Sequence, residues 1–223
     1  KDLSGEKTGA NGRHPLPSPE AWAKTKARLG INPNTLVVAY DKQGSVYASR
    51  LWWMLKSTGH ANVRVLDGGL DAWNGPMGSI PRAPTPCNQP IAPMPYAGLV
   101  LVDEVVTNLE TKKNKIIDAR SEDRFHGQNE TLDPVGGHIP GAMNRFFKNN
   151  LNATAFKTPE QLFKEFSESL GTTKASEVIH QCGSGVTACH NLLAMELAGF
   201  KGSRLYAGSW SEWCSDPKRP VEL

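Results

Sequence analysis

The sequence has no long apolar run and little cysteine. No stretch approaches the length of a membrane-spanning helix, and residues 1–17 lack the apolar core of a signal peptide. Four cysteines among 223 residues, without any CxxC pair, are too few for a disulfide scaffold. We therefore expect a chain that works in a reducing compartment, the cytoplasm, and does not bind membranes.

Concentrated charge is also missing. The formal net charge is only +3, and the 25 lysines and arginines are scattered along the chain. Because nucleic acids are bound through clustered cations, this distribution argues against nucleic acid as a partner. One cationic pocket for a small anion is still compatible with it.

A metal-ligand spacing is absent as well. His180, Cys182, Cys189 and His190 lie close together in the sequence. The strand and helix expected around them would point these side chains apart, however, and their spacing matches no structural zinc site. The sequence therefore predicts no metal site, and we expect Cys189 to belong to the core.

What is present is a strand, a glycine-containing loop and a helix in direct succession between Glu177 and Gly199. The apolar residues Val178 and Ile179 mark the strand, and Thr187 leads into the helix. In such a loop the backbone N–H groups can converge on one point, and the helix adds the positive end of its dipole. This succession predicts a cradle that binds an anion.

Cys182 begins the loop, at the mouth of this cradle. We interpret it as a nucleophile, because converging N–H donors would stabilise its thiolate. Gly183 and Gly185 favour this interpretation, since they remove side-chain bulk where a substrate must approach the backbone. The alternative is a small buried hydrophobic residue, the commoner role of a lone cysteine at a strand end.

Start signals and apolar runs predict an α/β fold. A helix is expected from the cap Ser18-Pro19-Glu20 to about Leu29, and the capping box Thr158-Pro159-Glu160-Gln161 opens another. The continuous apolar run from Thr35 to Tyr40 is typical of a strand that is covered on both faces of a parallel sheet. Further strands are expected at 62–66, 99–102, 115–119 and 203–206, further helices around 51–55 and at 105–110, and a long polar loop at 121–137.

Prolines divide the chain. Six of them fall between positions 81 and 95, so this segment can be neither helix nor central strand. We predict a partial first domain over residues 1–80, a stiff linker over 81–97, and a second domain over 98–223.

The two halves match each other. Residues 37–73 align with residues 178–213, so that Asp41 faces Cys182 and Gly44 faces Gly185. Each copy is long enough to hold several strands and helices, which indicates two copies of one α/β domain. Only the second copy keeps the cysteine, so we expect the first to be catalytically silent and to form a wall of the pocket.

These motifs resemble the tandem-domain rhodanese superfamily, the sulfurtransferases. The resemblance implies two rhodanese-like domains, each a mostly parallel sheet with helices on both faces. Its loop CGSGVT is similar to that of 3-mercaptopyruvate sulfurtransferases, whereas thiosulfate sulfurtransferases carry Arg and Lys where this chain has Gly183 and Ser184. Besides the cysteine loop and the proline-rich linker, the matching motifs are DGGLDAW at 67–73, DAR at 118–120, RF at 124–125, GHIPGA at 137–142 and GSWSEW at 208–213.

The resemblance also implies roles for single residues. Arg124, in the RF motif, matches the family arginine that holds the substrate anion. Mercaptopyruvate members usually have a second arginine further along, but the loop sequence NETLDPVGGH has none. Arg145 could supply the missing charge or could be structural. Asp118 and Arg120 are expected to be a structural pair that fixes the loop.

Within the loop, Ser184 is expected to donate to the substrate or relay a proton. The backbone N–H groups from Gly183 through Gly185 and Val186 to Thr187 are expected to hold the thiolate and then the persulfide, and Thr187 to cap the helix.

The start of the chain departs from the family pattern. Related first domains open with a strand, an acidic motif and a HIPGA-like turn, which are absent here, so the first domain is expected to be truncated. Mercaptopyruvate enzymes are thought to draw from that portion a His and an Asp that assist the loop serine. Ser184 would then lack its partners unless a second chain supplies them.

The resemblance therefore implies a persulfide mechanism without metal or organic cofactor. Cys182 takes sulfur from 3-mercaptopyruvate, a small anionic donor, and passes it to a thiol such as a thioredoxin, or to cyanide. Thiosulfate as donor, and a sulfur-carrier module without turnover, are the open alternatives. A cysteine phosphatase is disfavoured, because the arginine that such enzymes need six positions after the cysteine is Ala188 here.

Overall fold

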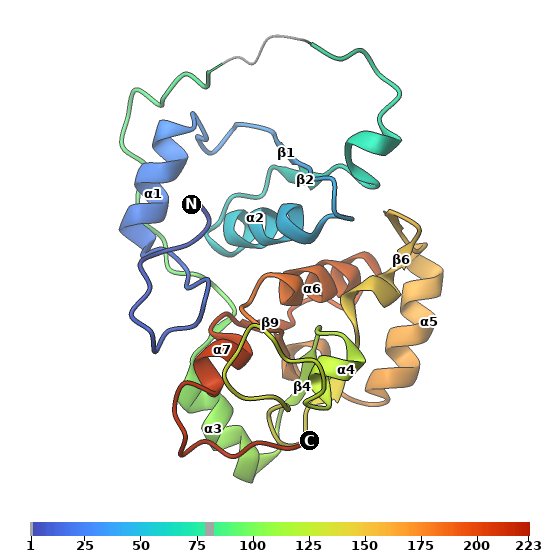
Figure 1. Cartoon of the computed structure of the whole chain (residues 1–223). Helices are drawn as coiled ribbons and strands as arrows, with labels where there is room; N and C mark the ends of the chain where they lie inside the picture. Colours follow the sequence, from blue (N-terminus) through green and yellow to red (C-terminus); the bar gives the residue numbers. More distant parts are fainter. Residues whose placement is uncertain (1, 79–82) are drawn as a thin grey trace.

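The computed structural model describes residues 2–78 and 83–223, and strands and helices alternate along the chain (Figure 1). Its α-helices are α1 (Pro19–Arg28), α2 (Val46–Ser57), α3 (Val102–Thr111), α4 (Glu122–Phe125), α5 (Pro159–Leu170), α6 (Thr187–Leu197) and α7 (Ser209–Trp213). Its 3-10 helices are η1 (Gly69–Ala72), η2 (Phe147–Asn150) and η3 (Ala175–Glu177). Its strands are β1 (Val37–Ala39), β2 (Val63–Val65), β3 (Leu99–Val100), β4 (Lys115–Asp118), β5 (Met143–Asn144), β6 (Leu151–Asn152), β7 (Ala155–Phe156), β8 (Val178–Gln181) and β9 (Arg204–Tyr206).

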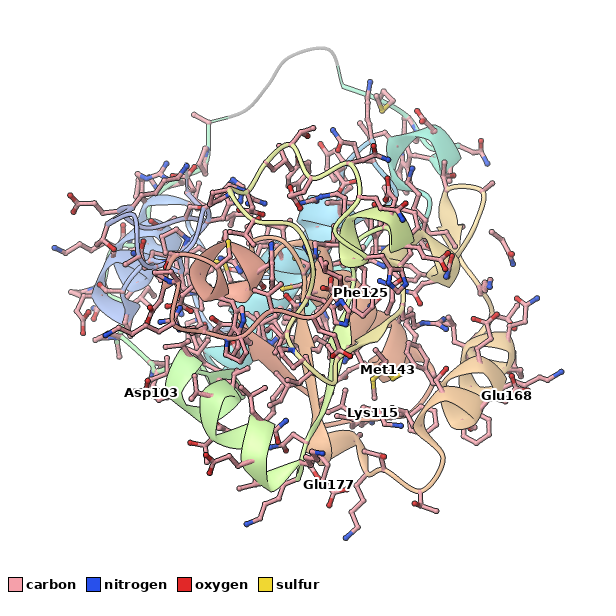
Figure 2. The ribbon with its side chains drawn as sticks, turned by 60° about the horizontal axis from the view of Figure 1, so that its bottom comes forward. Asp103, Lys115, Phe125, Met143, Glu168 and Glu177 are labelled. Atoms are coloured by element: carbon pink, nitrogen blue, oxygen red, sulfur yellow. The ribbon has the colours of Figure 1, made fainter. Side chains whose placement is uncertain are left out.

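The second half is built on a five-stranded parallel sheet with the strand order β3-β9-β8-β4-β5. Successive residues of a strand point to opposite faces, so Ile116 packs with α3 and α7 whereas Ile117 packs with α5 and α6. Figure 2 shows Asp103 of α3 and Glu168 of α5 on opposite sides of the molecule, with Lys115 of β4 between them. This half has helices on both faces of a parallel sheet, as expected.

The first half holds a smaller sheet, in which β1 and β2 pair in parallel. Helix α2 packs against both strands, but Leu36, Val38 and Tyr40 are 58%, 47% and 53% exposed. The prediction that residues 35–40 are covered on both faces is therefore wrong. A continuous apolar run shows that a strand is apolar, but it does not show which neighbours cover each face.

The two halves share a core. Helix α2 of the first half packs against α6 of the second (Figure 1). Trp52 and Trp53 join Cys189 and Leu192 in one buried cluster, which confirms Cys189 as a core residue. This packing fixes the first half directly beside the helix that follows Cys182.

The predicted linker is partly visible. Residues 79–82, which include Pro81, lie outside the described residues. Residues 83–97 contain no helix or strand. Tyr96 fastens the end of this segment, since its ring stacks on Trp53 at a centroid distance of 5.8 Å and its hydroxyl donates to the carbonyl oxygen of Pro17.

The predicted helix starts are confirmed. The hydroxyl of Ser18 accepts a hydrogen bond from the N–H of Ala21, and Thr158 and Gln161 form a reciprocal capping box. Inside the predicted polar loop 121–137 the structure adds the short helix α4. None of the helices among the described residues combines the length and the apolar character needed to cross a membrane.

Candidate active site

Cys182 follows directly after β8, and Asp118 ends the neighbouring strand β4. The carboxyl ends of parallel strands meet at one edge of a sheet, which is where ligands bind in open α/β folds. A cavity of about 400 Å³ opens there and is lined by both halves of the chain. Its lining includes the cationic residues Arg13, Arg120 and Arg124, the loop residues Cys182, Gly183, Ser184, Val186 and Thr187, and the apolar or aromatic residues Tyr47, Leu132, Phe146 and Phe147.

The loop after Cys182 presents free backbone donors. Cys182 is only 2% exposed, and its own N–H donates to the hydroxyl of Ser209 at 3.1 Å. In contrast, no acceptor within residues 2–78 and 83–223 is assigned to the N–H groups of residues 183–187. Buried N–H groups without a partner are costly, so this loop is suited to an anion that accepts from them.

The matching loop in the first half shows what this backbone geometry binds. There Asp41 stands where the second half has Cys182, and its carboxylate accepts four backbone hydrogen bonds of 2.8–2.9 Å. The donors are the N–H groups of Gln43, Ser45, Tyr47 and Ala48. In the first loop the carboxylate of Asp41 thus accepts the backbone hydrogen bonds, whereas the second loop has the thiol of Cys182 at the corresponding position.

Gly185 gives the loop its shape. Its φ of +73° lies in the left-handed region, and a Cβ there would come within 2.2 Å of the carbonyl oxygen of Ala207. Gly44 has the matching φ of +68° in the first loop. The carbonyl oxygen of Gly185 accepts from Nη1 of Arg50 at 2.8 Å, so an arginine of α2 holds the cysteine loop from the first half.

Ser184 has a histidine partner within this chain. Its Oγ lies 2.8 Å from Nδ1 of His14, a residue of the segment before α1. The expectation that Ser184 lacks this partner is therefore wrong, because the segment before α1 brings His14 to the loop. Partial burial, followed by the charges of Lys7 and Arg13, lowers the pKa of His14, so the imidazole is neutral at pH 7.

Arg50 links these parts. Besides Gly185, its guanidinium donates from Nη2 to the carbonyl oxygen of His14 at 3.0 Å. Arg50 is 1% exposed, although it lies on a helix of tryptophans and leucines. The sequence shows an arginine among the apolar residues of a predicted helix, and such a position is a signal for a role of this kind. Our sequence analysis missed this signal.

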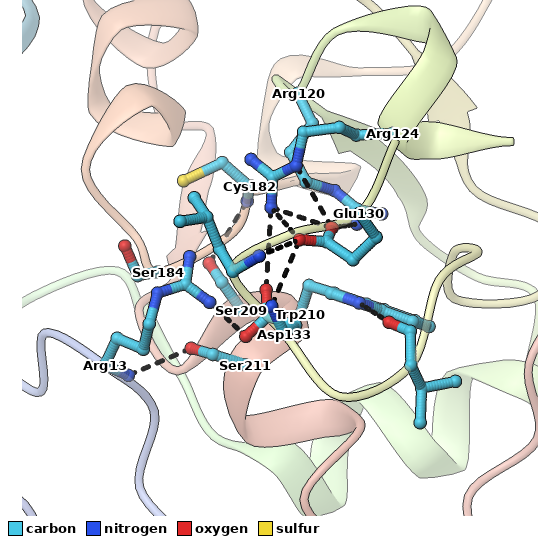
Figure 3. A network of polar contacts seen from close by, with 12 residues as sticks. Arg13, Arg120, Arg124, Glu130, Asp133, Cys182, Ser184, Ser209, Trp210 and Ser211 are labelled. Atoms are coloured by element: carbon cyan, nitrogen blue, oxygen red, sulfur yellow. Dashed lines mark hydrogen bonds and ion pairs between the residues drawn. The ribbon is translucent and has the colours of Figure 1, made fainter. Parts of the chain in front are cut away.

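Arg124 reaches the cavity from α4. Its guanidinium forms hydrogen bonds of 2.8–3.1 Å with Glu130, which is almost completely buried. Arg120 pairs with Asp118 at 2.7 Å and donates to the carbonyl oxygen of Gly137, which confirms this pair as structural. Figure 3 shows Arg124, Arg120 and Glu130 in one polar network beside Cys182.

A family model described as the rhodanese-like domain matches residues 6–76 and 101–216. The chain belongs to the rhodanese-like family. Its second match contains Cys182, and its first contains Asp41 at the corresponding place.

Two of the relatives that this chain matches are named as sulfurtransferases. A probable 3-mercaptopyruvate sulfurtransferase of Pseudomonas aeruginosa is 42% identical, over 99% of this chain and 80% of the relative. The thiosulfate sulfurtransferase of Bos taurus is 39% identical, over 89% of this chain and 69% of the relative. The chain is therefore an enzyme of the rhodanese superfamily of sulfurtransferases, and the choice of donor rests on its own site.

A solved structure agrees with this assignment. The 3-mercaptopyruvate sulfurtransferase from Leishmania major superposes with a TM-score of 0.79 at 30% sequence identity. The match covers 99% of this chain and 62% of the Leishmania chain. The fold of two rhodanese-like domains is thereby confirmed.

Arg145 does not reach the rhodanese-like site. Its Nη2 pairs with Glu165 at 2.8 Å and its Nε donates to Asn150 at 3.0 Å, while its guanidinium lies over the ring of Phe166. It is not among the residues that line the cavity. The expectation that Arg145 could hold the substrate is wrong. Its contacts with Glu165, Asn150 and Phe166 fit the alternative, a structural role.

Two smaller expectations concern the helix start and metals. Helix α6 begins at Thr187 with Val186 as its N-cap, and no side chain caps it, so the predicted cap by Thr187 is wrong. Thr187 instead lines the cavity. No group of three His, Cys, Asp or Glu side chains among the described residues is placed to hold a metal ion.

Proposed function

We propose that this rhodanese-like chain transfers sulfur from 3-mercaptopyruvate to a thiol or to cyanide through a persulfide on Cys182. The observation that carries the proposal is the contact of 2.8 Å between Oγ of Ser184 and Nδ1 of His14. Ser184 follows Cys182 by two positions in the sequence. A hydroxyl held in this way suits a donor whose carbonyl oxygen gains negative charge during the reaction.

In the first step, the Cys182 thiolate attacks the sulfur of 3-mercaptopyruvate. The new S–S bond forms as the C–S bond breaks, and the electron pair of that bond passes to carbon, so pyruvate leaves as its enolate. The proton of the substrate thiol ends on the enolate carbon, which leaves an anionic persulfide and pyruvate. No acceptor among the described residues is assigned to the N–H groups of residues 183–187, which supports a role for them in stabilising that terminal sulfur anion.

Ser184 and His14 act on the carbonyl end. A neutral His14 with its proton on Nδ1 donates to Oγ of Ser184, and this leaves the Ser184 O–H free to donate to the developing enolate oxygen. In this scheme Ser184 touches the substrate, and His14 is a positioning residue that acts through it.

In the second step, an acceptor attacks the terminal sulfur of the persulfide. A thiolate acceptor becomes a persulfide, cyanide becomes thiocyanate, and in both cases the Cys182 thiolate is restored. A small thiol protein such as a thioredoxin is the proposed physiological acceptor. All four cysteines among the described residues are free thiols, which supports a reducing compartment such as the cytoplasm.

The direct test is mass spectrometry of the protein after exposure to 3-mercaptopyruvate. We expect the mass of one sulfur atom to be added to Cys182, pyruvate to be released in equal amount, and activity to be lost in Cys182→Ser. Cys87→Ser is the matched control, because Cys87 lies outside this cavity.

Three results would contradict the proposal. Unmodified Cys182 after donor exposure would exclude the persulfide mechanism. A higher kcat/KM for thiosulfate than for 3-mercaptopyruvate would make thiosulfate the donor, the reaction for which the bovine relative is named. Sulfur loading without release to any acceptor would make the chain a carrier.

A further inference from the structure

A second cavity, of about 630 Å³, lies between the first half of the chain and the linker. Its volume is within the range of about 300–1,000 Å³ that small-molecule sites usually have. Three segments line it: the end of α1 with the turn that follows, the turn after α2, and linker residues between positions 87 and 94. Among the described residues, none that lines this cavity also lines the cavity of Cys182, so the two are separate.

The linker is held against α1 at this cavity (Figure 1). The N–H of Cys87 donates to the carbonyl oxygen of Ala27 at 2.8 Å, and a Cβ on Gly30 would overlap the carbonyl oxygen of Thr85. In the turn after α2, Nε2 of His60 lies 3.0 Å from the carbonyl oxygen of Thr35. Contacts between separate segments therefore hold the walls of the cavity in place.

Lys26 of α1 lines this cavity although it is only 5% exposed. Lysine is seldom buried to this extent without a partner. Its neighbour Arg28 pairs with Asp2, but within residues 2–78 and 83–223 no acceptor and no carboxylate is assigned to Nζ of Lys26. The described residues that line the cavity include no aspartate or glutamate either. Burial lowers the pKa of Lys26, and a carboxylate beside its ammonium group would offset that cost.

Much of the remaining lining is apolar. It consists of Ile31, Pro33, Pro90, Ile91, Ala92 and Met94. An inorganic anion beside Lys26 would leave these side chains in contact with water. A molecule that joins a carboxylate to a hydrocarbon body would use both the charge and the apolar surface.

We infer that this cavity is a second binding site, which takes a small amphipathic carboxylate. The carboxylate pairs with Nζ of Lys26, and the hydrocarbon body lies against Ile31, Ile91 and Met94. Such a ligand contacts the first half and the linker at once. The inference goes beyond sulfur transfer and does not depend on it, because the two cavities are lined by different residues.

The test is a titration of the protein with octanoate, followed by NMR of the backbone amides. We expect saturable shifts in residues 26–32, 58–60 and 87–92, with a Kd below about 1 mM. Octanamide has the same shape without the charge and should bind at least about tenfold more weakly. Lys26→Met should weaken the binding of octanoate by a similar factor and change that of octanamide little. Lys24→Met is the matched control, because Lys24 is exposed on the same helix.

A second variant leaves the buried lysine in place. Met94 is 48% exposed, so Met94→Asp should fold normally and bring a negative charge into the cavity lining. We expect it to weaken the binding of octanoate several-fold, by repulsion between like charges, and that of octanamide much less.

Four results would overturn the inference. The first is no saturable shift at about 10 mM octanoate, and the second is a shift confined to residues 182–187, which would place octanoate in the cavity of Cys182. The third is equal affinity for octanoate and octanamide, or an unchanged Kd for octanoate in Lys26→Met. The fourth is a Kd for sulfate as low as that for octanoate, which would make the cavity a simple anion site. Failure of sulfur transfer would differ from all four, since the protein would then form no persulfide on Cys182.

Discussion

In the proposed mechanism, the hydroxyl of Ser184 distinguishes two sulfur donors by the negative charge that develops on each of them. When 3-mercaptopyruvate loses sulfur, negative charge moves to a carbonyl oxygen that can accept a hydrogen bond from Ser184. When thiosulfate donates its outer sulfur, sulfite leaves, and it carries its negative charge without taking a proton. The contact between Ser184 and His14 should therefore matter for one donor and not for the other.

His14→Gln is the variant that tests this pair. We expect kcat for 3-mercaptopyruvate to fall by at least about tenfold, because the serine loses the group that orients its hydroxyl. Sulfur transfer from thiosulfate should change little. Rates with both donors between pH 5 and 8 provide the measurement, and the acid limb that reflects the lowered pKa of His14, below pH 6.5, should disappear in the variant.

The control for that experiment is His126→Gln, since His126 is exposed and does not line the cavity. Ser184→Ala should cause a loss similar to that of His14→Gln, and the double variant should lose little more, because residues that act as a unit are not additive. Equal losses with both donors would show that His14 merely supports the loop.

At the scale of single elements, the loops after β1 and β8 have a similar backbone conformation but different side chains at their first position, Asp41 and Cys182. In the first loop the carboxylate of Asp41 occupies the cradle and thereby completes the hydrogen bonds at the start of α2. In the second, no acceptor among the described residues is assigned to the N–H groups of residues 183–187. Helices α2 and α6, which follow these two loops, pack against each other.

Asp41→Ala should therefore lower the stability of the protein. It leaves four N–H groups without their acceptor, and we expect the free energy of unfolding to fall by about 2 kcal/mol or more. Urea unfolding followed by tryptophan fluorescence measures this change. Asp71→Ala, at an exposed acid of η1, should stay within about 0.5 kcal/mol of the wild type. Equal effects of the two substitutions would contradict the role given to Asp41.

Elements with local signals could be predicted from the sequence. The caps at Ser18 and Thr158 fixed two helix starts, and the glycine loop after β8 indicated a cradle of backbone donors. Coverage of β1 could not be predicted, because it depends on neighbours elsewhere in the chain. Arg13 and His14 lie in a segment without any periodic pattern, and their partners in the site are more than 100 residues away. Only the folded chain brings them to Cys182.

At the scale of the whole molecule, buried histidines make stability depend on pH. Burial lowers the pKa of His180 to about 3 and that of His190 to about 4, whereas in the unfolded chain both are near 6.5. Below pH 6.5 the unfolded chain takes up protons that the folded chain does not. The stability that these residues contribute is full above pH 6.5 and is lost as the pH falls towards 4.

We expect each of these two histidines to lower the free energy of unfolding by about 2 kcal/mol between pH 7.5 and pH 5. Urea unfolding at the two pH values measures the sum. His190→Gln should remove its share of the difference, whereas the exposed His126→Gln should not. The same pH dependence in His190→Gln and the wild type would show that carboxylates alone account for the acid sensitivity.

The contact between His14 and Ser184 joins positions 170 residues apart. During synthesis the histidine leaves the ribosome first, and the serine follows 170 residues later. The second half must then fold and dock against the first before Arg50 can hold both the cysteine loop and the N-terminal segment. In the proposed mechanism, Cys182 therefore acquires the contacts of its loop with the first half only after the two halves have docked, and sulfur transfer would report that docking.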